Sequence, residues 1–430
     1  MHSLWSETTN LPSFAPLEKS QKTDVLIIGG GITGILCAYY LKQARIPYIL
    51  VEADTICSGI TQNTTAKITS QHGLIYSKLL RTSREKAQLY LNANEAALSE
   101  YRKLCKHISC DFENRNSYVY SLSDSHKIEA ELDALYTLGY PAEYALQIPL
   151  PFQTAGAVCF PNQAQFHPLK FISEISGGLN IYEHTKVQEL IGTTAVTNHG
   201  RIVADKIIVA THFPILNKHG SYFLKLYQHR SYVLALENVP PLSGMYVDEA
   251  DKGLSFRTYK NLLLLGGGSH RTGKQGGNWA ELEQFAKKHY KKSAIAYRFA
   301  TQDCMSLDSV PYIGTYAKHT PNLYVATGYN KWGMTSSMAA ALLLKDLILN
   351  RDNPYKELFS PSRSILHPQL FVNALESTAN LITPAKKRCP HLGCALKWNP
   401  VERSWDCPCH GSRFQENGQL IDNPATDDLK

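Results

Sequence analysis

The sequence predicts an α/β fold, α+β overall, with a large part built on a parallel sheet and a small all-β domain at the C-terminal end. Three observations lead to this prediction. A strand, a glycine-rich turn and a helix follow one another at residues 25–41, and similar apolar strand segments recur at 204–214 and 322–348. Four cysteines and two histidines gather between Cys389 and Phe414. A chain of 430 residues is also longer than one compact core usually accommodates, which indicates two or three domains.

Composition narrows the class of protein. Hydrophobic residues make up 43% of the chain and charged residues 19%, close to ordinary globular usage. No apolar run reaches the roughly 18 residues of a membrane span, and the N-terminus lacks the pattern of a secretory signal. We therefore expect a cytoplasmic protein without a transmembrane segment. The net charge of +7 is spread along the chain except at residues 385–388, so we expect no binding to nucleic acid.

The first organised segment predicts a dinucleotide site. The apolar run 25–28 leads into three glycines at G-x-G-x-x-G spacing and then into a helical pattern. In such a turn the first glycine lets the chain reverse, the second admits a pyrophosphate, and the third lets the helix pack closely on the strand. A second strand, 48–51, ends at a carboxylate that can accept hydrogen bonds from a ribose. A purely structural glycine turn is the alternative. The residues expected at the dinucleotide are Gly29, Gly31, Ile32, Thr33, Gly34 and Glu52.

A later segment favours a flavin over a nicotinamide. Residues 322–348 read as a strand, a loop containing glycine and a long helix. The N-terminus of a helix presents N–H groups and partial positive charge, which suit the pyrimidine carbonyl of a flavin that becomes anionic on reduction. A nicotinamide has no equivalent need, so the sequence predicts FAD.

Six short motifs then carry a family resemblance, in the same order as in the family. They are "DVLIIGGGITG", "VEAD", "FHPLKF", "YEHTKV", "LDSVPYIG" and "ATGYNKWGMTSS". With them the chain resembles the D-amino-acid oxidase, glycine oxidase and sarcosine oxidase class of FAD-dependent oxidoreductases. The resemblance implies a Rossmann-like FAD-binding domain from residues 1–78, 164–213 and 300–350, and a discontinuous substrate domain from 79–163 and 214–299.

The same resemblance implies further cofactor contacts. The backbone of Val187 would lie by the adenine, and Ala210 and Thr211 would lie near the dinucleotide. Gly333, Met334 and Thr335 would lie against the flavin ring, and Gly328 is a further expected cofactor-binding residue. Some relatives attach the flavin through a cysteine, for which Cys57 and Cys304 are candidates, although a buried inert thiol is the alternative for each.

The cysteine and histidine cluster predicts a metal centre. Cys389 and His391 form C-x-H, and Cys407 and His410 form C-x-x-H after a spacer of fifteen residues. Two thiolates suit one iron and two imidazoles suit the other in a Rieske [2Fe–2S] centre, while a tetrahedral zinc site is the alternative. "CPHLGC" and "CPCHGS" resemble the Rieske proteins of respiratory and photosynthetic cytochrome complexes, which favours iron and sulfur. The remaining pair, Cys394 and Cys409, could form a disulfide between the two loops.

The expected Rieske domain, residues 385–430, is short, and residues 351–384 read as a linker and a helix. A domain of this size buries little apolar area, so we expect it to lean on the larger part of the chain. Phe414 stands where high-potential Rieske proteins usually carry a tyrosine, so we expect a potential below the top of the range of about −150 to +300 mV.

Both ends together resemble bacterial FAD-dependent oxidoreductases with a C-terminal Rieske domain. We expect a dehydrogenase in which an amine or amino acid gives a hydride to FAD N5, and electrons leave singly through the cluster to an external acceptor, a carrier protein or a quinone. One alternative is an electron-transfer or redox-sensing protein without a small substrate. Another is an oxidase that uses O2 and holds a structural zinc.

Five residues are candidates for the substrate site. Tyr329, Lys331 and Trp332 belong to the predicted flavin loop, whereas Arg257 and His270 stand at strand ends of the predicted substrate domain. An arginine there could bind a carboxylate through two hydrogen bonds. A structural or surface role is the alternative for each of the five.

Overall fold

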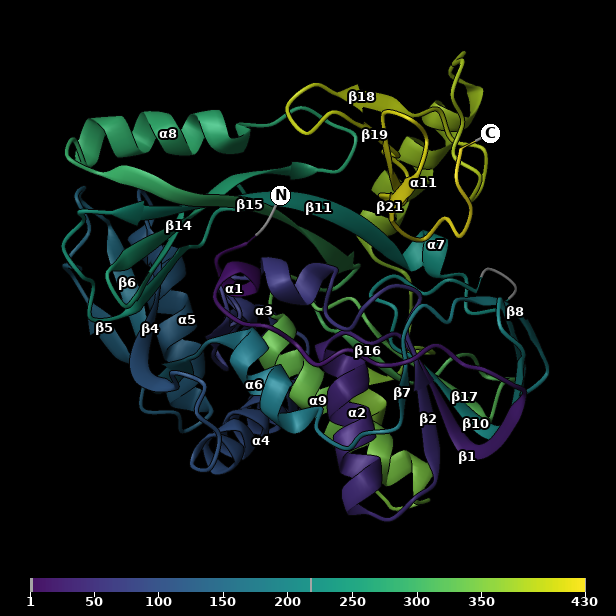
Figure 1. The fold of residues 1–430 in the computed structure, drawn as a ribbon. Coiled ribbons are helices and arrows are strands. Elements are labelled where there is room, and N and C mark those ends of the chain that lie inside the picture. The colour runs from purple at the N-terminus through teal and green to yellow at the C-terminus, as the bar shows by residue number, and fades with distance from the viewer. Residues whose placement is uncertain (1–2, 217–218, 430) are drawn as a thin grey trace.

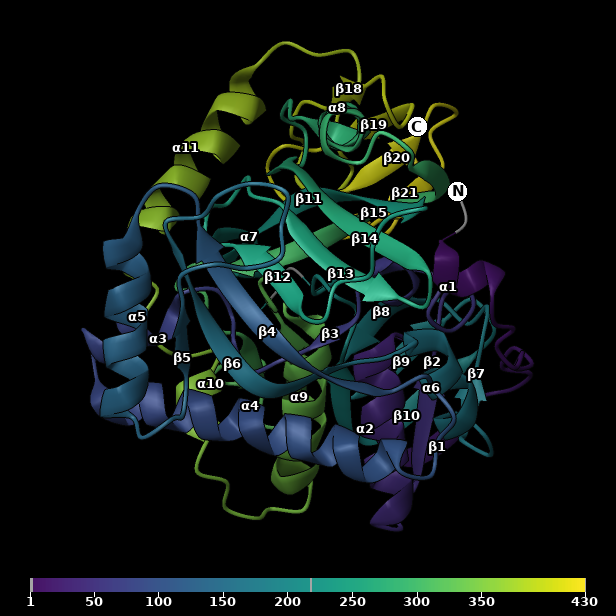
Figure 2. The same ribbon diagram turned by 90° about the vertical axis from the view of Figure 1, so that its left-hand side faces the viewer.

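The computed structural model describes residues 3–216 and 219–429, whose strands form three sheets (Figure 1). Two large sheets build the body, and a four-stranded sheet at the C-terminal end lies against the second of them (Figures 1 and 2). The mixed α/β architecture with a small all-β end is the fold class that the sequence predicts.

The first large sheet has eight strands in the order β16-β17-β10-β1-β2-β7, with β9 paired to β10 and β8 paired to β9. Its centre, from β17 to β7, is parallel, and residues 25–28 and 48–51 are buried as the apolar runs in β1 and β2 require. Its strands are β1 (Gln21–Ile28), β2 (Tyr48–Val51), β7 (Ile181–Tyr182), β8 (Val187–Ile191), β9 (Thr194–Thr197), β10 (Arg201–Val209), β16 (Tyr312–Thr315) and β17 (Leu323–Thr327).

Two buried helices pack side by side on this sheet, α2 (Ile32–Gln43) and α9 (Gly333–Ile348). Both begin at glycine-containing turns that follow a parallel strand, so their N-termini meet at the carboxyl edge of the sheet. Crevices at this edge are where α/β sheets bind ligands.

The second large sheet has nine strands in the order β15-β11-β14-β13-β12-β4-β6-β3, with β5 paired to β6. It is antiparallel except for the β12–β4 pair. Its strands are β3 (Lys67–Ile68), β4 (Glu113–Ser121), β5 (Glu143–Ala145), β6 (Gly156–Gln165), β11 (Leu226–Glu237), β12 (Met245–Asp248), β13 (Ser255–Tyr259), β14 (Leu262–Arg271) and β15 (Ala294–Ser306).

Further helices surround the two sheets. The long helix α4 (Arg84–Cys105) packs against α9, and α8 (Asn278–His289) covers β14 and β11. The others are α1 (Leu4–Glu7), α3 (Ile75–Leu80), α5 (Ser125–Thr137), α6 (Pro168–Ile175), α7 (Tyr222–Lys225), α10 (Lys356–Phe359) and a 3₁₀ turn at Ile60–Asn63.

The C-terminal part begins with helix α11 (Pro368–Ile382) at the edge of the molecule (Figure 2). An antiparallel sheet follows, with strands β18 (Lys397–Asn399), β19 (Ser404–Asp406), β20 (Arg413–Gln415) and β21 (Leu420–Asp422). Phe414 is fully buried in the small core of this sheet. The expectation that this part leans on the body agrees with its position beside β11 and β15 (Figure 1).

The sheets do not follow the predicted domain bounds at three strands. Strand β3 lies within the segment 1–78 but joins the second sheet, because it pairs with β6. Strands β6 and β15 each cross a predicted bound, at 164 and 300. We therefore keep the discontinuous arrangement as a proposal, with β3 assigned to the substrate domain.

Candidate active site and metal centre

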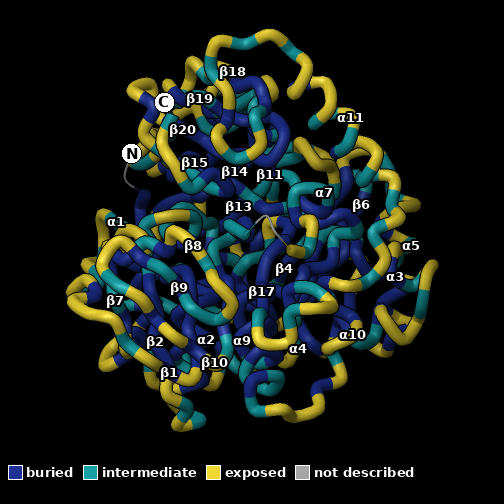
Figure 3. The backbone as a smooth tube through the Cα atoms, turned by 90° about the vertical axis from the view of Figure 1, so that its right-hand side faces the viewer, coloured by how far each residue is buried: buried dark blue, intermediate teal, exposed yellow. Residues whose placement is uncertain are grey.

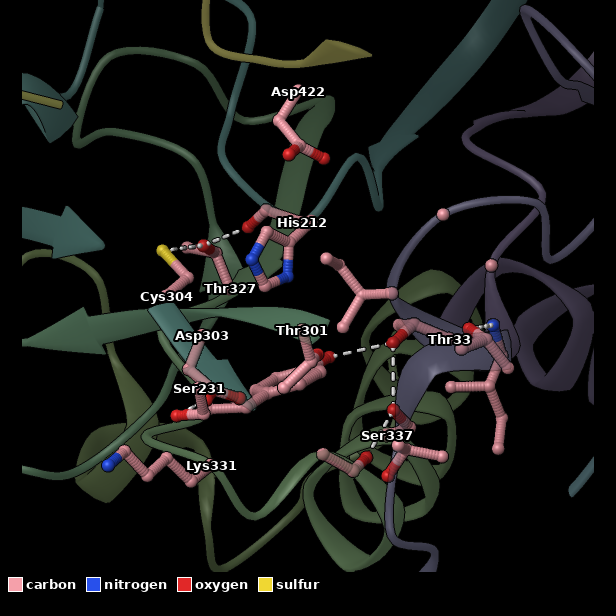
Figure 4. Close-up of a pocket in the computed structure, with 18 of the residues that line it drawn as sticks. Thr33, His212, Ser231, Thr301, Asp303, Cys304, Thr327, Lys331, Ser337 and Asp422 are labelled. Atoms are coloured by element: carbon pink, nitrogen blue, oxygen red, sulfur yellow. Dashed lines mark hydrogen bonds between the residues drawn. The ribbon is translucent and has the colours of Figure 1, made fainter. Parts of the chain in front are cut away.

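A cavity of about 970 Å³ lies between the two large sheets. Its wall runs from the glycine turn before α2, past the loop before α9, to Asn423 and Asp422 of the C-terminal part. Figure 4 shows Asp422 at the cavity. The volume is at the upper end of the range for cofactor and ligand sites. One continuous cavity therefore touches all three sheets.

The turn before α2 fits a pyrophosphate. Gly29 has a left-handed backbone, with φ of 108°, and a Cβ there would lie 2.6 Å from the carbonyl oxygen of Ala210. A Cβ on Gly34 would overlap the carbonyl oxygen of Gly29. Above Gly31, by contrast, the nearest atom to a Cβ is the hydroxyl of Thr61 at 3.5 Å. The backbone is thus crowded where the helix packs and open where phosphates would approach the N–H groups of α2.

Glu52 is held at this turn by the backbone. Its Oε2 accepts a hydrogen bond from the N–H of Gly30 at 2.7 Å, and its Oε1 accepts one from the N–H of Asp54 at 2.9 Å. Burial raises the pKa of Glu52, and these backbone hydrogen bonds oppose the rise. A carboxylate has about four acceptor positions, so it can still accept hydrogen bonds from a ribose. The ribose contact remains a prediction.

We expect Gly34→Ala to lose bound flavin. The added methyl group would displace α2 from the turn at a cost of about 1–3 kcal/mol, which corresponds to a weakening of FAD binding by about tenfold or more. The flavin absorbance per chain after purification measures the effect. Gly177→Ala is the matched control, because its Cβ would meet only the carbonyl oxygen of Glu174, at 3.5 Å. Equal flavin content in both variants would contradict the assignment.

Most other predicted cofactor residues line the cavity. Gly34 and Thr335 do not. The hydroxyl of Thr335 donates to the carbonyl oxygen of Thr69 at 3.0 Å and lies 2.9 Å from Nε2 of His72. It therefore anchors the start of α9 from behind the wall. The predicted residues on the wall are Gly29, Gly31, Ile32, Thr33, Glu52, Val187, Ala210, Thr211, Gly328, Gly333 and Met334.

Three of the five substrate candidates also line the cavity, namely Tyr329, Lys331 and Trp332. The hydroxyl of Tyr329 lies 3.1 Å from that of Thr33, and the Trp332 ring stacks on His72 with centroids 5.0 Å apart. Lys331 extends on the side of Asp303 (Figure 4). Their chemical roles remain predictions.

The other two candidates lie elsewhere, and we correct the expectation for them. Arg257 is fully buried, and its Nη1 donates to the carbonyl oxygens of Thr65 and Ala66, both at 2.7 Å. His270 is bound through its two ring nitrogens to the Tyr232 hydroxyl and the Arg271 carbonyl oxygen. Neither lines the cavity, so the structure gives both a structural role in the second sheet.

Two titratable residues on the wall were not predicted from the sequence. Lys67, at the start of β3, is partly buried on the wall, and burial together with the nearby Arg257 cation lowers its pKa to about 7. Asp303 is also partly buried, burial raises its pKa, and its Oδ2 accepts a hydrogen bond from Ser231 at 3.3 Å (Figure 4). Lys67 sits in the polar run "TTAKITSQ", which gives no periodic signal for a functional residue.

The two candidates for covalent flavin attachment, Cys57 and Cys304, both line the cavity. Burial raises the pKa of Cys304 to about 12 and raises that of Cys57 as well. Because the thiolate is the reactive form of cysteine, these thiols are poorly suited to attack a flavin. Non-covalent FAD is therefore our proposal.

The predicted cluster ligands come together in the C-terminal part. The rings of His391 and His410 have centroids 4.9 Å apart, and the thiols of Cys389 and Cys407 lie close enough to interact with each other. Cys394 and Cys409 form a disulfide between the two loops, with Cα atoms 6.6 Å apart.

This arrangement fits a [2Fe–2S] centre. Both ring nitrogens of His410 are buried and have no hydrogen-bond partner among the residues that the structure describes. Two thiols and two imidazoles at one place are the Rieske donor set. The sulfurs of Cys394, Cys407 and Cys409 also lie within 4.8 Å of one another, but two of them belong to the disulfide. The first set is therefore the better candidate for the cluster.

The cluster loops dock on the second sheet through their carbonyl groups. Gln228 of β11 donates to the carbonyl oxygen of His410, and Gln302 of β15 donates to that of Gly411, both at 2.8 Å. Arg271 donates to the carbonyl oxygen of Cys409 at 3.2 Å. A Cβ on Gly411 would lie 2.6 Å from the Cβ of Gln228, so the loop and the strand are in direct contact.

A buried ion network holds the same interface. Glu402 of the C-terminal part receives hydrogen bonds from Arg230 of β11, whose Nε lies 2.9 Å from Oε1, and from the Tyr232 hydroxyl at 3.0 Å. Arg413 of β20 reaches the same carboxylate at 3.0 Å. The side chains of Arg230 and Glu402 are 7% and 8% exposed, so this pair is shielded from water.

Residues 211–213 separate the cavity from the cluster loops. Thr211 and His212 line the cavity, and the Phe213 ring lies 6.3 Å from the rings of both His391 and His410. Asn423 of the C-terminal part donates to the carbonyl oxygen of Phe213 at 2.9 Å. One short segment after β10 therefore touches both sites.

Family models match both parts of the chain. The model described as FAD dependent oxidoreductase matches residues 24–347, and the Rieske [2Fe-2S] domain model matches residues 367–430. The chain belongs to the family of FAD-dependent oxidoreductases and carries a C-terminal Rieske domain. Its cofactors are FAD and a [2Fe–2S] cluster. Within the described residues, no helix combines the length and apolar character needed to cross a membrane.

Individual relatives agree with this assignment. The putative Rieske 2Fe-2S iron-sulfur protein YhfW of Bacillus subtilis (strain 168) is 33% identical over 99% of this chain and 96% of its own length. A cytochrome b6-f complex iron-sulfur subunit 3 of Nostoc sp. (strain PCC 7120) is 48% identical over 42 residues, covering 10% of this chain and 24% of its own.

Two solved structures show the same fold over most of the chain. Glycine oxidase from Geobacillus kaustophilus has a TM-score of 0.68 and 19% identity, over 80% of this chain and 99% of its own. L-proline dehydrogenase from P. horikoshii has a TM-score of 0.68 and 15% identity, over 80% and 98%.

Proposed function

We propose that the protein is a dehydrogenase that oxidises an amine or amino acid in the cavity and sends the electrons through the cluster to an external acceptor, a carrier protein or a quinone. FAD takes two electrons from a substrate and can release them one at a time, which suits a cluster that holds one. The placement of residues 211–213 against both the cavity and the histidine pair carries this proposal. We also propose a cytoplasmic location.

The proposal gives roles to residues on the cavity wall. Oxidation of an amine requires the neutral amine, so a proton must leave a substrate ammonium first. Lys67, whose pKa is about 7, is neutral in about half of the molecules near neutral pH and can accept that proton at Nζ. Ser231, Asp303 and Lys331 supply further polar groups on the wall, on the side away from Thr33 and Ser337, where they can orient the substrate (Figure 4).

The cluster would be held by Cys389, His391, Cys407 and His410, with the disulfide fixing the two loops. The amide groups of Gln228 and Gln302 orient the loop that carries His410. The body thereby keeps the rings of His391 and His410 beside residues 211–213.

The test uses anaerobic protein with both cofactors and low-temperature EPR. A panel of glycine, sarcosine, L-proline and other D- and L-amino acids is added one at a time. We expect an active substrate to bleach the flavin and to produce a rhombic [2Fe–2S] signal in the native protein. In Cys407→Ser the flavin should bleach without the signal, whereas Cys105→Ser, a change outside the cluster loops, should behave like the native protein.

Two other results would contradict the proposal and indicate a different function. Zinc without iron, together with rapid O2 consumption and peroxide release, would indicate an oxidase with a structural zinc site. A flavin that no amine reduces, but that a reduced carrier protein reduces readily, would indicate an electron-transfer protein without a small substrate.

A further inference from the structure

Helix α11 has its polar side toward the protein and its apolar side outward. Asn373 and Asn380 are buried, at 2% and 7% exposure, whereas Phe371, Leu375 and Ile382 are 65%, 71% and 77% exposed. The Asn373 amide forms hydrogen bonds with the body of the protein. Its oxygen accepts one from Arg271 at 3.0 Å, and its nitrogen donates one to the Leu224 carbonyl oxygen at 3.3 Å. A surface helix of a globular protein normally buries its apolar side and exposes its polar side.

The exposed side chains form one group, which we name the α11 patch. It holds seven of the seventeen large apolar side chains that are exposed in the described part of the chain, although it spans only residues 366–392. Figure 3 shows the exposed outer turns of this helix. Such a concentration is typical of an interaction surface. Its members are Leu366, Phe371, Val372, Leu375, Leu381, Ile382 and Leu392.

The charges around the α11 patch are positive. Lys386, Lys387 and Arg388 follow the end of the helix at Ile382 after three intervening residues. The single acidic residue within 366–392 is Glu376, and its carboxylate lies 2.7 Å from the Nζ of Lys274 on the body. The patch therefore offers apolar side chains and basic groups without an unpaired carboxylate, the combination with which interfacial helices bind anionic lipid.

A second copy of the chain is a poorer occupant. In a two-fold dimer the same surface meets itself, so two basic segments would enter one interface. The α11 patch has no free carboxylate to receive them. Helix α11 is also too short to span a membrane, because it has 15 residues and a spanning helix needs about 20.

We propose that the α11 patch docks on an anionic membrane surface, with the helix lying in the plane of the interface. Leu392, a member of the patch, is the neighbour of His391 in the cluster loop. Docking therefore brings the cluster to the lipid boundary. If the proposed function also holds, this position makes a lipid-soluble quinone the external acceptor, which takes two electrons and two protons per molecule.

The experiment measures binding of the full-length protein with both cofactors to sedimented vesicles, without substrate. We expect binding to phosphatidylcholine vesicles containing about 30% phosphatidylglycerol and much weaker binding to pure phosphatidylcholine. Lys386→Glu should weaken binding by about fivefold or more, because one basic group becomes acidic. The triple variant Phe371→Ser, Leu375→Ser, Ile382→Ser should abolish it.

The matched control is Leu146→Ser with Ile191→Ser, two side chains that are 66% and 58% exposed far from the α11 patch in sequence. It should bind like the native protein, and flavin absorbance and cluster EPR verify that every variant is folded. Absence of binding, or equal binding to both vesicle types, would overturn the proposal. So would a dimer, seen by light scattering, that the triple serine variant dissociates. Failure to oxidise any amine leaves this measurement unaffected, so the two proposals fail separately.

Discussion

Glu402→Gln should reduce the free energy that stabilises the C-terminal domain against the body by about 3 kcal/mol. The carboxylate of Glu402 faces Arg230 of the body and Arg413 of its own domain, and the Arg230–Glu402 pair is almost completely buried. Removing the negative charge leaves Arg230 enclosed without its partner, which is more costly than losing a surface ion pair. Urea unfolding followed through the visible circular dichroism of the cluster measures the change.

Glu416→Gln is the control for this experiment. Glu416 pairs with Arg403 in the same domain, but the two side chains are 59% and 73% exposed, so the loss should be at most about 1 kcal/mol. A loss of the same size in both variants would mean that the buried network does not hold the interface.

The pH dependence of the Glu402 effect has a definite sign. Burial acts to raise the pKa of Glu402, but the guanidinium groups of Arg230 and Arg413 outweigh it and lower the pKa to about 2. The stabilisation is therefore present above the ordinary pKa of about 4.3 and is lost as the pH falls toward 2. We expect the difference between the native protein and Glu402→Gln to be constant above about pH 5 and to shrink below it.

Lys67→Met should lower kcat/KM for an active amine by about 10²- to 10⁴-fold, the usual contribution of a positioned base. Lys67 lines the cavity, and its pKa of about 7 makes it a proton acceptor near neutral pH. In the native protein kcat/KM should rise with pH through about 7, as the Nζ of Lys67 loses its proton. The variant should lose this limb of the profile while keeping its flavin.

Lys86→Met is the matched control, because Lys86 is an exposed lysine on α4. It should leave both the rate and the pH profile unchanged. If Lys67→Met shows the native profile, a different group removes the proton, and Lys67 has a structural role.

The local structure of short motifs could be predicted from the sequence where each residue of the motif has a physical reason. The glycine turn before α2 is an example, because the carbonyl oxygens that crowd Gly29 and Gly34 leave room for no side chain. The two cluster loops are another, since their spacing alone defines a donor set. The α/β class followed from the buried strands of the first sheet.

The direction in which an individual side chain points could not be predicted in the same way. Arg257 and His270 were expected at the cavity, but pairing within the second sheet turns them toward backbone and hydroxyl groups. Lys67 was missed because its low pKa arises from burial and from Arg257, which is 190 positions away in sequence. Thr335 belongs to the right helix, but it lies behind the wall of the cavity.

The docking of the cluster loop has a consequence for how this protein can be divided. The family models divide the chain into two modules, yet the carbonyl oxygens of His410 and Gly411 receive their hydrogen bonds from Gln228 and Gln302 on the other side of the division. In an excised C-terminal fragment these carbonyls would turn to water, and the loop would lose the template that shapes it. The Rieske domain of this protein is therefore not an interchangeable part, because the shape of its cluster loop depends on hydrogen bonds from the flavoprotein to which it is joined.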